Sequence, residues 1–138
     1  MNARILCGYD GSAAAETAFD FALALASAFK SELRVLAVAQ LPEPPEDVET
    51  EALVESAQDH FEKLFVGLRA KAAAAGVTPG FEVSAGHPAE QILYHADSWN
   101  VDHIVLGHRG KNAFGRWLMG SVSHRIISYA VCTVTVVR

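Results

Sequence analysis

The chain has 138 residues, of which 51% are hydrophobic and 20% charged, a balance typical of a folded globular protein. Eleven basic residues stand against 16 acidic ones, a net charge of −5, which argues against nucleic acid or an anionic membrane as the main partner. The longest apolar stretch, residues 21–29, is far too short to span a bilayer. We therefore expect one cytoplasmic domain, covering residues 1–138, with Cys7 and Cys132 as free thiols.

Strand and helix patterns alternate along the whole chain, with no internal repeat. The first half of the pattern predicts a strand at 4–9, a helix with Ser12 as its N-cap, a strand at 33–39 and a proline-rich loop at 40–50. A helix at 51–75, closed by Gly76, and a strand at 80–85 follow. The last part predicts a helix with Pro88 in its first turn, a strand at 101–107, a short helix beginning at Ser121, and a strand at 131–138.

Apolar residues at helical spacing predict which face of each helix is buried. In the first helix these residues are Ala14, Ala18, Phe21, Leu25 and Phe29. In the second they are Leu53, Ala57, Phe61, Leu64, Leu68 and Ala72.

The first four strands are continuous apolar runs separated by helices, which indicates a parallel sheet covered on both faces. The fifth strand differs, because Cys132, Val134 and Val136 fall on one side and Thr133 and Thr135 on the other. This mixed pattern predicts an edge strand, which has to be covered or paired.

Three turns carry residues suited to a ligand: Gly8–Ser12, Gly107–Gly110 and Gly120–Ser123. Ligands of doubly wound α/β proteins bind beyond the carboxyl ends of the strands. The last turn is the best anion site, because a helix N-terminus offers free N–H groups and its two serines add hydroxyls. Asp10 can accept a hydrogen bond from an amino or hydroxyl group. Together the turns predict a nucleotide with a polar head and an anionic tail.

Common catalytic and nucleotide motifs are absent. Residues 107–112 (GHRGKN) lack the spacing of a P-loop, and no G-x-G-x-x-G or G-x-S-x-G follows a strand. The six histidines show no metal-ligand spacing, so we expect no structural metal site. Only His108 and His124 are candidates for a general base beside phosphates.

The pattern Gly107-x₂-Gly110-x₉-Gly120-Ser121 resembles that of the ATP-binding branch of the universal stress protein family (UspA-like). The resemblance covers the whole chain, including the Asp-Gly-Ser after the first strand. It implies a single-domain, open, twisted, five-stranded parallel sheet with helices on both faces, Rossmann-like and similar to adenine nucleotide alpha hydrolases, with strand order 3-2-1-4-5. It further implies a regulatory or stress-response factor that binds ATP, with Mg²⁺ or Mn²⁺, and forms a homodimer through the C-terminal strand.

Carried over position by position, the resemblance assigns the base, the ribose and the phosphates to consecutive parts of the chain. The residues so assigned are Gly8, Asp10 and Val38 for the base, Leu106, Gly107, Arg109 and Gly110 for the ribose and phosphates, and Gly120, Ser121, Val122 and Ser123 for the phosphates. Two positions depart from the family pattern. Gly8 stands where members commonly have Pro or an aliphatic residue, so we expect a looser base pocket. Thr133 stands where Pro is common, which leaves an extra N–H at the dimer edge.

Simpler readings stay open beside this one. Asp10 can brace its own turn, Ser121 and Ser123 can be ordinary N-caps, and Arg109 can be a solvated loop charge. Two other functions stay open as well. One is slow ATP hydrolysis, for which no evident base lies in the sequence. The other is a nucleotide-free dimeric interaction module, a branch that typically lacks the glycine pattern.

Overall fold

The computed structural model describes residues 3–40, 47–108 and 113–138, and the side chains of these residues except 47–49 and 113–120. Strands and helices alternate as the sequence predicts. The elements in chain order are β1 (Arg4–Tyr9), α1 (Ala13–Phe29), β2 (Glu32–Ala39), α2 (Asp47–Ala74), β3 (Gly80–Ala85), α3 (Pro88–Ser98), β4 (His103–Gly107), α4 (Ala113–Tyr129) and β5 (Thr133–Val137).

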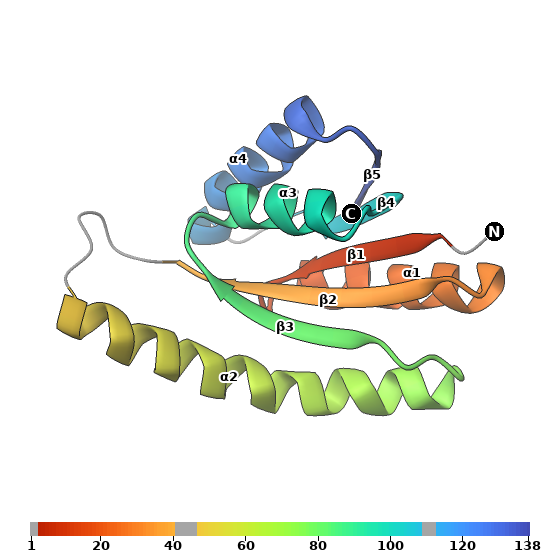
Figure 1. Ribbon diagram of the computed structural model, residues 1–138, viewed down its shortest axis with the longest axis horizontal. Helices are drawn as coiled ribbons and strands as arrows, with labels where there is room; N and C mark the ends of the chain where they lie inside the picture. Colours follow the sequence, from red (N-terminus) through yellow and green to blue (C-terminus); the bar gives the residue numbers. More distant parts are fainter. Residues whose placement is uncertain (1–2, 41–46, 109–112) are drawn as a thin grey trace.

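The five strands form one parallel sheet in the order β3-β2-β1-β4-β5, which confirms the predicted fold class and strand order. Helices α1 and α2 pack on one face, and α3 and α4 pack on the other (Figure 1). The chain builds outward from β1 to β2 and β3, then crosses to β4 on the opposite side of β1. The strand order therefore reverses between β1 and β4, at the point where ligands of such sheets bind.

The ends of the helices follow the expected capping rules. The Ser12 hydroxyl accepts a hydrogen bond of 3.1 Å from the N–H of Ala15, so Ser12 is the N-cap of α1. Gly76 has a φ of +72° just after α2, in the left-handed region that glycine adopts without strain. Pro88 begins α3, where its missing N–H costs nothing.

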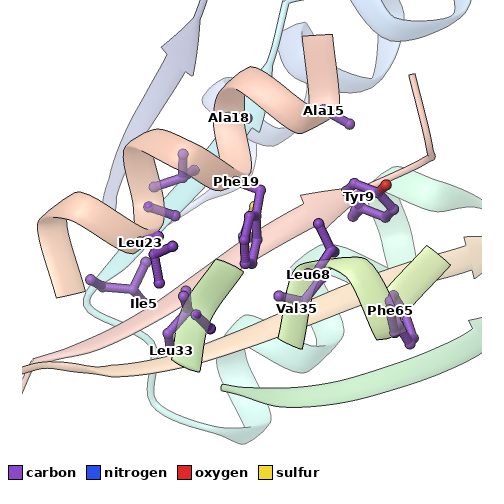
Figure 2. Close-up of a cluster of buried hydrophobic side chains, with 14 of the residues drawn as sticks. Ile5, Tyr9, Ala15, Ala18, Phe19, Leu23, Leu33, Val35, Phe65 and Leu68 are labelled. Carbon is purple, nitrogen blue, oxygen red and sulfur yellow. The ribbon is translucent and has the colours of Figure 1, made fainter. Parts of the chain in front are cut away.

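The larger hydrophobic cluster lies between the sheet, α1 and α2 (Figure 2). Phe19 of α1 and Phe65 of α2 are fully buried there, and Phe65 stacks at a tilt on Phe81 of β3 with 4.8 Å between ring centroids. The second cluster lies under α3 and α4 and is centred on Leu6, Ile104 and other aliphatic side chains. Both faces of the sheet are thus covered by helices and hydrophobic side chains, as the apolar strand sequences indicate.

The buried face of α1 is only partly the one that the periodicity predicts: Ala18 is buried and Leu25 packs against the core, but the two phenylalanines of the predicted face are exposed. Phe21 is 41% exposed and Phe29 is 66% exposed. The buried residues are Ala15, Ala18, Phe19, Ala22, Leu23 and Ala26. Because α1 is apolar around most of its circumference, spacing alone does not fix its rotation. By contrast, the predicted stripe of α2 is largely correct, although Leu53 is exposed and the sequence reading missed Phe65.

Two helices begin earlier than the sequence predicts. Helix α2 begins at Asp47 and not at residue 51, because the acidic residues Asp47, Glu49 and Glu51 suit the positive end of the helix dipole. The prolines of the loop lie outside the described residues. Helix α4 begins at Ala113 and not at Ser121. The residues that precede Gly120, RWLM, are compatible with a helix, and one glycine costs only about 1 kcal/mol within it.

Strand β5 lies at the edge of the sheet beside β4, as its mixed pattern predicts. None of its residues is fully buried. The ring of His103 on β4 lies 2.6 Å (Nε2 to Oγ1) from Thr135 on β5, and burial lowers the pKa of that histidine. A polar contact thus joins the edge strand to the rest of the sheet. None of the helices in the described parts of the chain combines the length and hydropathy needed to cross a bilayer.

Candidate functional site

A cavity of about 310 Å³ opens at the carboxyl ends of β1 and β2, beside β4. Its volume lies at the lower end of the range for small-molecule sites, and its wall is mostly apolar. The lining residues are Gly8, Tyr9, Asp10, Leu36, Val38, Ala39, Gln40, Ala57, Phe61, Pro88, Ile92, Leu106 and Val122. In Figure 1 this edge of the sheet is at the left, where α2 begins.

Five of the residues that the sequence assigns to a nucleotide line this one cavity. They are Gly8, Asp10, Val38, Leu106 and Val122. They come from β1, the turn after it, β2, β4 and α4, and the reversal of strand order brings these elements together. The cavity therefore gathers residues from both ends of the sequence around the switch point.

Asp10 both lines the cavity and braces its turn. The N–H of Ser12 donates to Oδ1 of Asp10 at 3.0 Å, which forms an Asx turn ahead of α1. The prediction that Asp10 braces its own turn is therefore confirmed. Because Asp10 is half-buried at the cavity wall, the same carboxylate is also placed to meet a ligand.

Gly8 does not loosen the pocket as expected. A Cβ at this position would lie 2.8 Å from Cδ2 of Leu106 and 3.1 Å from Cδ1 of Ile92. The two aliphatic side chains therefore already fill the space that a larger residue would take. The cavity wall at Gly8 is tight.

Gly107 serves the packing of α1. A Cβ there would lie 2.5 Å from the carbonyl oxygen of Ala14 and 2.9 Å from the nitrogen of Ala15. The end of β4 thus touches the backbone of the first turn of α1, which only glycine allows. The requirement for glycine at this position comes from the fold, whatever else binds nearby.

The segment Gly120–Ser123 is not the start of a helix. It lies inside α4, where interior N–H groups serve the helix itself. Ser121 is exposed, whereas Ser123 is 7% exposed. Among the described residues, no hydrogen-bond partner reaches the buried Oγ of Ser123. A buried hydroxyl without a partner is costly, and this one follows directly on Val122 of the cavity wall.

The remaining predicted positions lie elsewhere. Arg109 and Gly110 lie outside the described residues. His108 and His124, the candidate bases, are exposed and do not line the cavity. Of the described lining residues, only Asp10 and Tyr9 are ionisable.

Sequence reasoning missed the part of the wall that α2 and α3 supply. The sequence pattern of these helices indicates only that Ala57, Phe61 and Ile92 lie on apolar faces, as ordinary core residues do. Only tertiary packing brings them to the strand ends. Tyr9 was missed because it reads as the last residue of an apolar strand.

Tyr9 anchors the cavity wall to both helices of its face. Its hydroxyl donates to Oε1 of Glu16 on α1 at 2.5 Å, and Lys71 on α2 reaches Oε2 of Glu16 at 3.4 Å and Asp20 at 3.1 Å. Burial, followed by the hydrogen bond to Glu16, raises the pKa of the phenol, so it stays neutral. The hydroxyl is thus committed to this network and not to proton transfer.

The described residues contain no group of three or more side chains of the kinds that hold a metal ion. Cys7 is free and buried, and burial raises its pKa to about 12. Cys132 is free and half-buried, away from this cavity. The cavity combines mostly apolar walls with one carboxylate, that of Asp10, which suits binding of a partly polar small molecule.

The fold and the site define a class: open α/β proteins with a parallel sheet and a small-molecule cavity at the switch point. The sequence pattern of the universal stress protein family matches residues 1–138. The chain therefore belongs to this family.

Known relatives agree with this assignment over nearly their full lengths. The universal stress protein YxiE of Bacillus subtilis is 31% identical, with 98% of each chain covered. The structure of the universal stress protein UspA from Lactobacillus plantarum superposes with a TM-score of 0.87 at 27% identity and covers 99% of this chain and 98% of that one.

Two more distant structures share the fold and contain ligands. One is a universal stress protein in complex with cAMP, with a TM-score of 0.67 at 21% identity over 99% of this chain and 97% of that one. The other, from Arabidopsis thaliana, has AMP bound, with a TM-score of 0.68 at 19% identity over 98% of this chain and 90% of that one.

A methyl group at Gly107 is expected to destabilise the fold. Gly107→Ala forces the first turn of α1 away from β4, at a cost of roughly 1–3 kcal/mol in the free energy of unfolding, as is typical of overpacked sites. Gly67→Ala is the matched control, because a Cβ there meets nothing within 4 Å on the exposed face of α2. The control should gain about 0.5–1 kcal/mol. Urea denaturation of both variants measures the difference, and equal effects would contradict the packing role.

Proposed function

We propose that this chain is an ATP-binding universal stress protein, a homodimeric regulatory or stress-response factor of the cytoplasm. The observation that carries the proposal is the convergence of Gly8, Asp10, Val38, Leu106 and Val122 on one cavity at the switch point. Family membership and the adenine nucleotides in two distant members support it. The two free cysteines accord with a reducing compartment.

The base end of the cavity suits an adenine ring. Leu36, Ile92 and Leu106 offer apolar contact to its faces, and Asp10 can accept a hydrogen bond from its amino group. The Gln40 side chain lies at the exposed rim and can both donate and accept hydrogen bonds.

The phosphate end rests on fewer groups. With Gly120–Ser123 inside α4, the backbone N–H groups serve the helix, and the hydroxyls of Ser121 and Ser123 remain as donors. The partnerless Oγ of Ser123 fits such a role. A divalent cation, Mg²⁺ or Mn²⁺, would come with the phosphates, because the described residues offer no cluster of metal ligands of their own. It would neutralise phosphate charge.

Bound nucleotide should be detectable in the wild-type protein. Native mass spectrometry of protein purified without added nucleotide should reveal a bound adenine nucleotide, or a thermal melt should shift upward with Mg-ATP. A ligand at one hundred times its Kd adds about 2.7 kcal/mol of stability.

Filling the cavity should weaken that binding. Ala57→Leu adds bulk at the wall and is expected to raise the Kd for ATP by about tenfold or more, since the base must give up apolar contact area. Ala52→Leu, on the exposed part of the same helix, is the control and should bind normally. If the wild-type protein carries no nucleotide after purification and its melting temperature does not change with Mg-ATP, the proposal is overturned in favour of a nucleotide-free interaction module.

Ser123→Ala is expected to act in opposite directions on stability and on binding. Removing a buried hydroxyl without a partner should stabilise the ligand-free protein by about 1 kcal/mol, whereas loss of a phosphate donor should raise the Kd for ATP several-fold. Ser128→Ala is the control, because that exposed hydroxyl donates to the carbonyl of His124. Chemical denaturation and calorimetric titration measure the two effects. Unchanged ATP binding in Ser123→Ala would remove this residue from the phosphate site.

The dimer is proposed at the open edge of β5, where an unpaired strand invites pairing with a second copy. We expect a dimer at micromolar concentration in sedimentation experiments. Thr133→Lys places a charge on the exposed edge and should give monomers. Ser56→Lys on α2 is the control and should leave the dimer intact. A monomeric wild-type protein would contradict the proposal.

A further inference from the structure

A second cavity lies at the opposite, amino-terminal edge of the sheet. Its volume is about 660 Å³. Its wall comes from the last turns of α1, the segments that follow α1, α2 and α3, and the starts of β2 and β3. The lining residues are Ala26, Ser27, Lys30, Ser31, Glu32, Leu33, Arg34, Gly76, Val77, Thr78, Gly80 and Trp99. We call this cavity the amino-edge groove.

Arg34 is the central side chain of the amino-edge groove. It runs across Gly80 of the neighbouring strand, with Cγ and Nε each 3.8 Å from where a Cβ of that glycine would stand. Its guanidinium carbon then lies 4.2 Å from the centroid of the Trp99 ring. The indole thus holds the guanidinium plane in place by a cation–π contact.

Among the described residues, the fold leaves the side-chain hydrogen-bond donors of Arg34 without an acceptor. A guanidinium has five N–H donors in a fixed fork, and no acceptor for any of them occurs in the described ranges of the chain. Arg4, by contrast, donates to the carbonyl of Trp99 at 2.8 Å and pairs with Glu32 at 3.1 Å. Arg4 therefore already binds the end of α3, and the structure does not need Arg34 for that purpose.

Lys30 adds a second unpaired cation to the same groove. Its backbone closes α1 by donating to the carbonyl of Ala26, while its ammonium group contacts no carboxylate of the described residues. Elsewhere on this acidic chain, Arg69, Lys71 and Arg125 each pair with a carboxylate. Within the described residues, the amino-edge groove is therefore lined by two cations, Arg34 and Lys30, that pair with no carboxylate.

Compensation of helix dipoles accounts for part of this arrangement. The four helices all end at this edge of the sheet, and their terminal carbonyls favour nearby cations. That effect requires only positive charge. It does not require a guanidinium over an indole ring with no acceptor for its donors among the described residues, and the fork of a guanidinium matches carboxylate and phosphate groups.

We propose that the amino-edge groove binds a small anion that carries phosphate or carboxylate groups. Arg34 supplies two parallel hydrogen bonds, Trp99 holds it in position, and Lys30 adds the second charge. The hydroxyls of Ser31 and Thr78 line the same groove and can donate to the anion. The site lies at the opposite edge of the sheet from the cavity at the carboxyl ends of the strands, which we call the strand-end cavity. Its test is therefore independent of ATP binding.

The test is an NMR titration of the ¹⁵N-labelled protein with inorganic pyrophosphate and, separately, with citrate. Shifts at the amides of Ser31 and Gly80 and at the indole N–H of Trp99 are expected. Saturation by either anion supports the site, and the tighter of the two identifies the preferred group. Shifts confined to residues of the strand-end cavity, or none up to millimolar anion, would overturn the proposal.

Variants separate specific binding from general charge attraction. Arg34→Gln should weaken anion binding about tenfold, because a bidentate charge-assisted contact is lost. Arg34→Lys keeps the charge without the fork and should recover only part of the affinity. Lys63→Gln is the matched control, since this lysine is also exposed and unpaired among the described residues but lies on α2, outside the groove.

Lys30→Gln keeps the proposal testable should changes at Arg34 disturb the fold. Because Lys30 is exposed, its loss should leave the amide spectrum of the free protein intact and weaken binding about threefold. Equal weakening in Lys30→Gln and Lys63→Gln would show that only net charge matters, and would overturn the assignment.

Discussion

The contact between Gly107 and the first turn of α1 is the constraint on which the site depends. With a carbonyl oxygen only 2.5 Å from the space where a Cβ would stand, α1 can sit on β4 only if that residue is glycine. The position of α1 fixes the turn that precedes it, and Asp10 with it. Through Glu16 and Lys71 the same helix is connected to α2, which supplies another part of the cavity wall. One absent side chain thus aligns three elements around the switch point.

Much of the fold could be predicted from the sequence because its strands are local, apolar and clearly bounded. The expected strands at 4–9 and 80–85 agree with β1 and β3 at both ends. The cap at Ser12 rests on one hydrogen bond, a local interaction that residue type alone indicates. The order of the strands came from family resemblance, since a non-local arrangement cannot be read from spacing.

Other features depend on tertiary contacts that no local pattern encodes. The rotation of α1 depends on its packing against the sheet, so two residues of its predicted face, Phe21 and Phe29, proved exposed in a helix that is apolar nearly all round. The start of α4 was misplaced because Gly120 and Ser121 were taken for a helix start, whereas the helix continues through them. The sequence also did not show that Gly107 is needed for packing against the backbone of α1, or that Leu106 and Ile92 fill the space beside Gly8. The walls from α2 and α3 look like ordinary core in the sequence.

The position of Cys7 in the central strand gives the protein a built-in reporter of its own opening. The thiol is fully buried and burial raises its pKa to about 12, so it is protonated at pH 7. A thiol-modifying reagent can therefore reach a reactive thiolate there only when β1 separates from its neighbours. Cys132, which directly precedes β5, is half-buried and so is already partly accessible in the folded protein. Modification of Cys7 thus reports opening of the central strand, and modification of Cys132 does not require it.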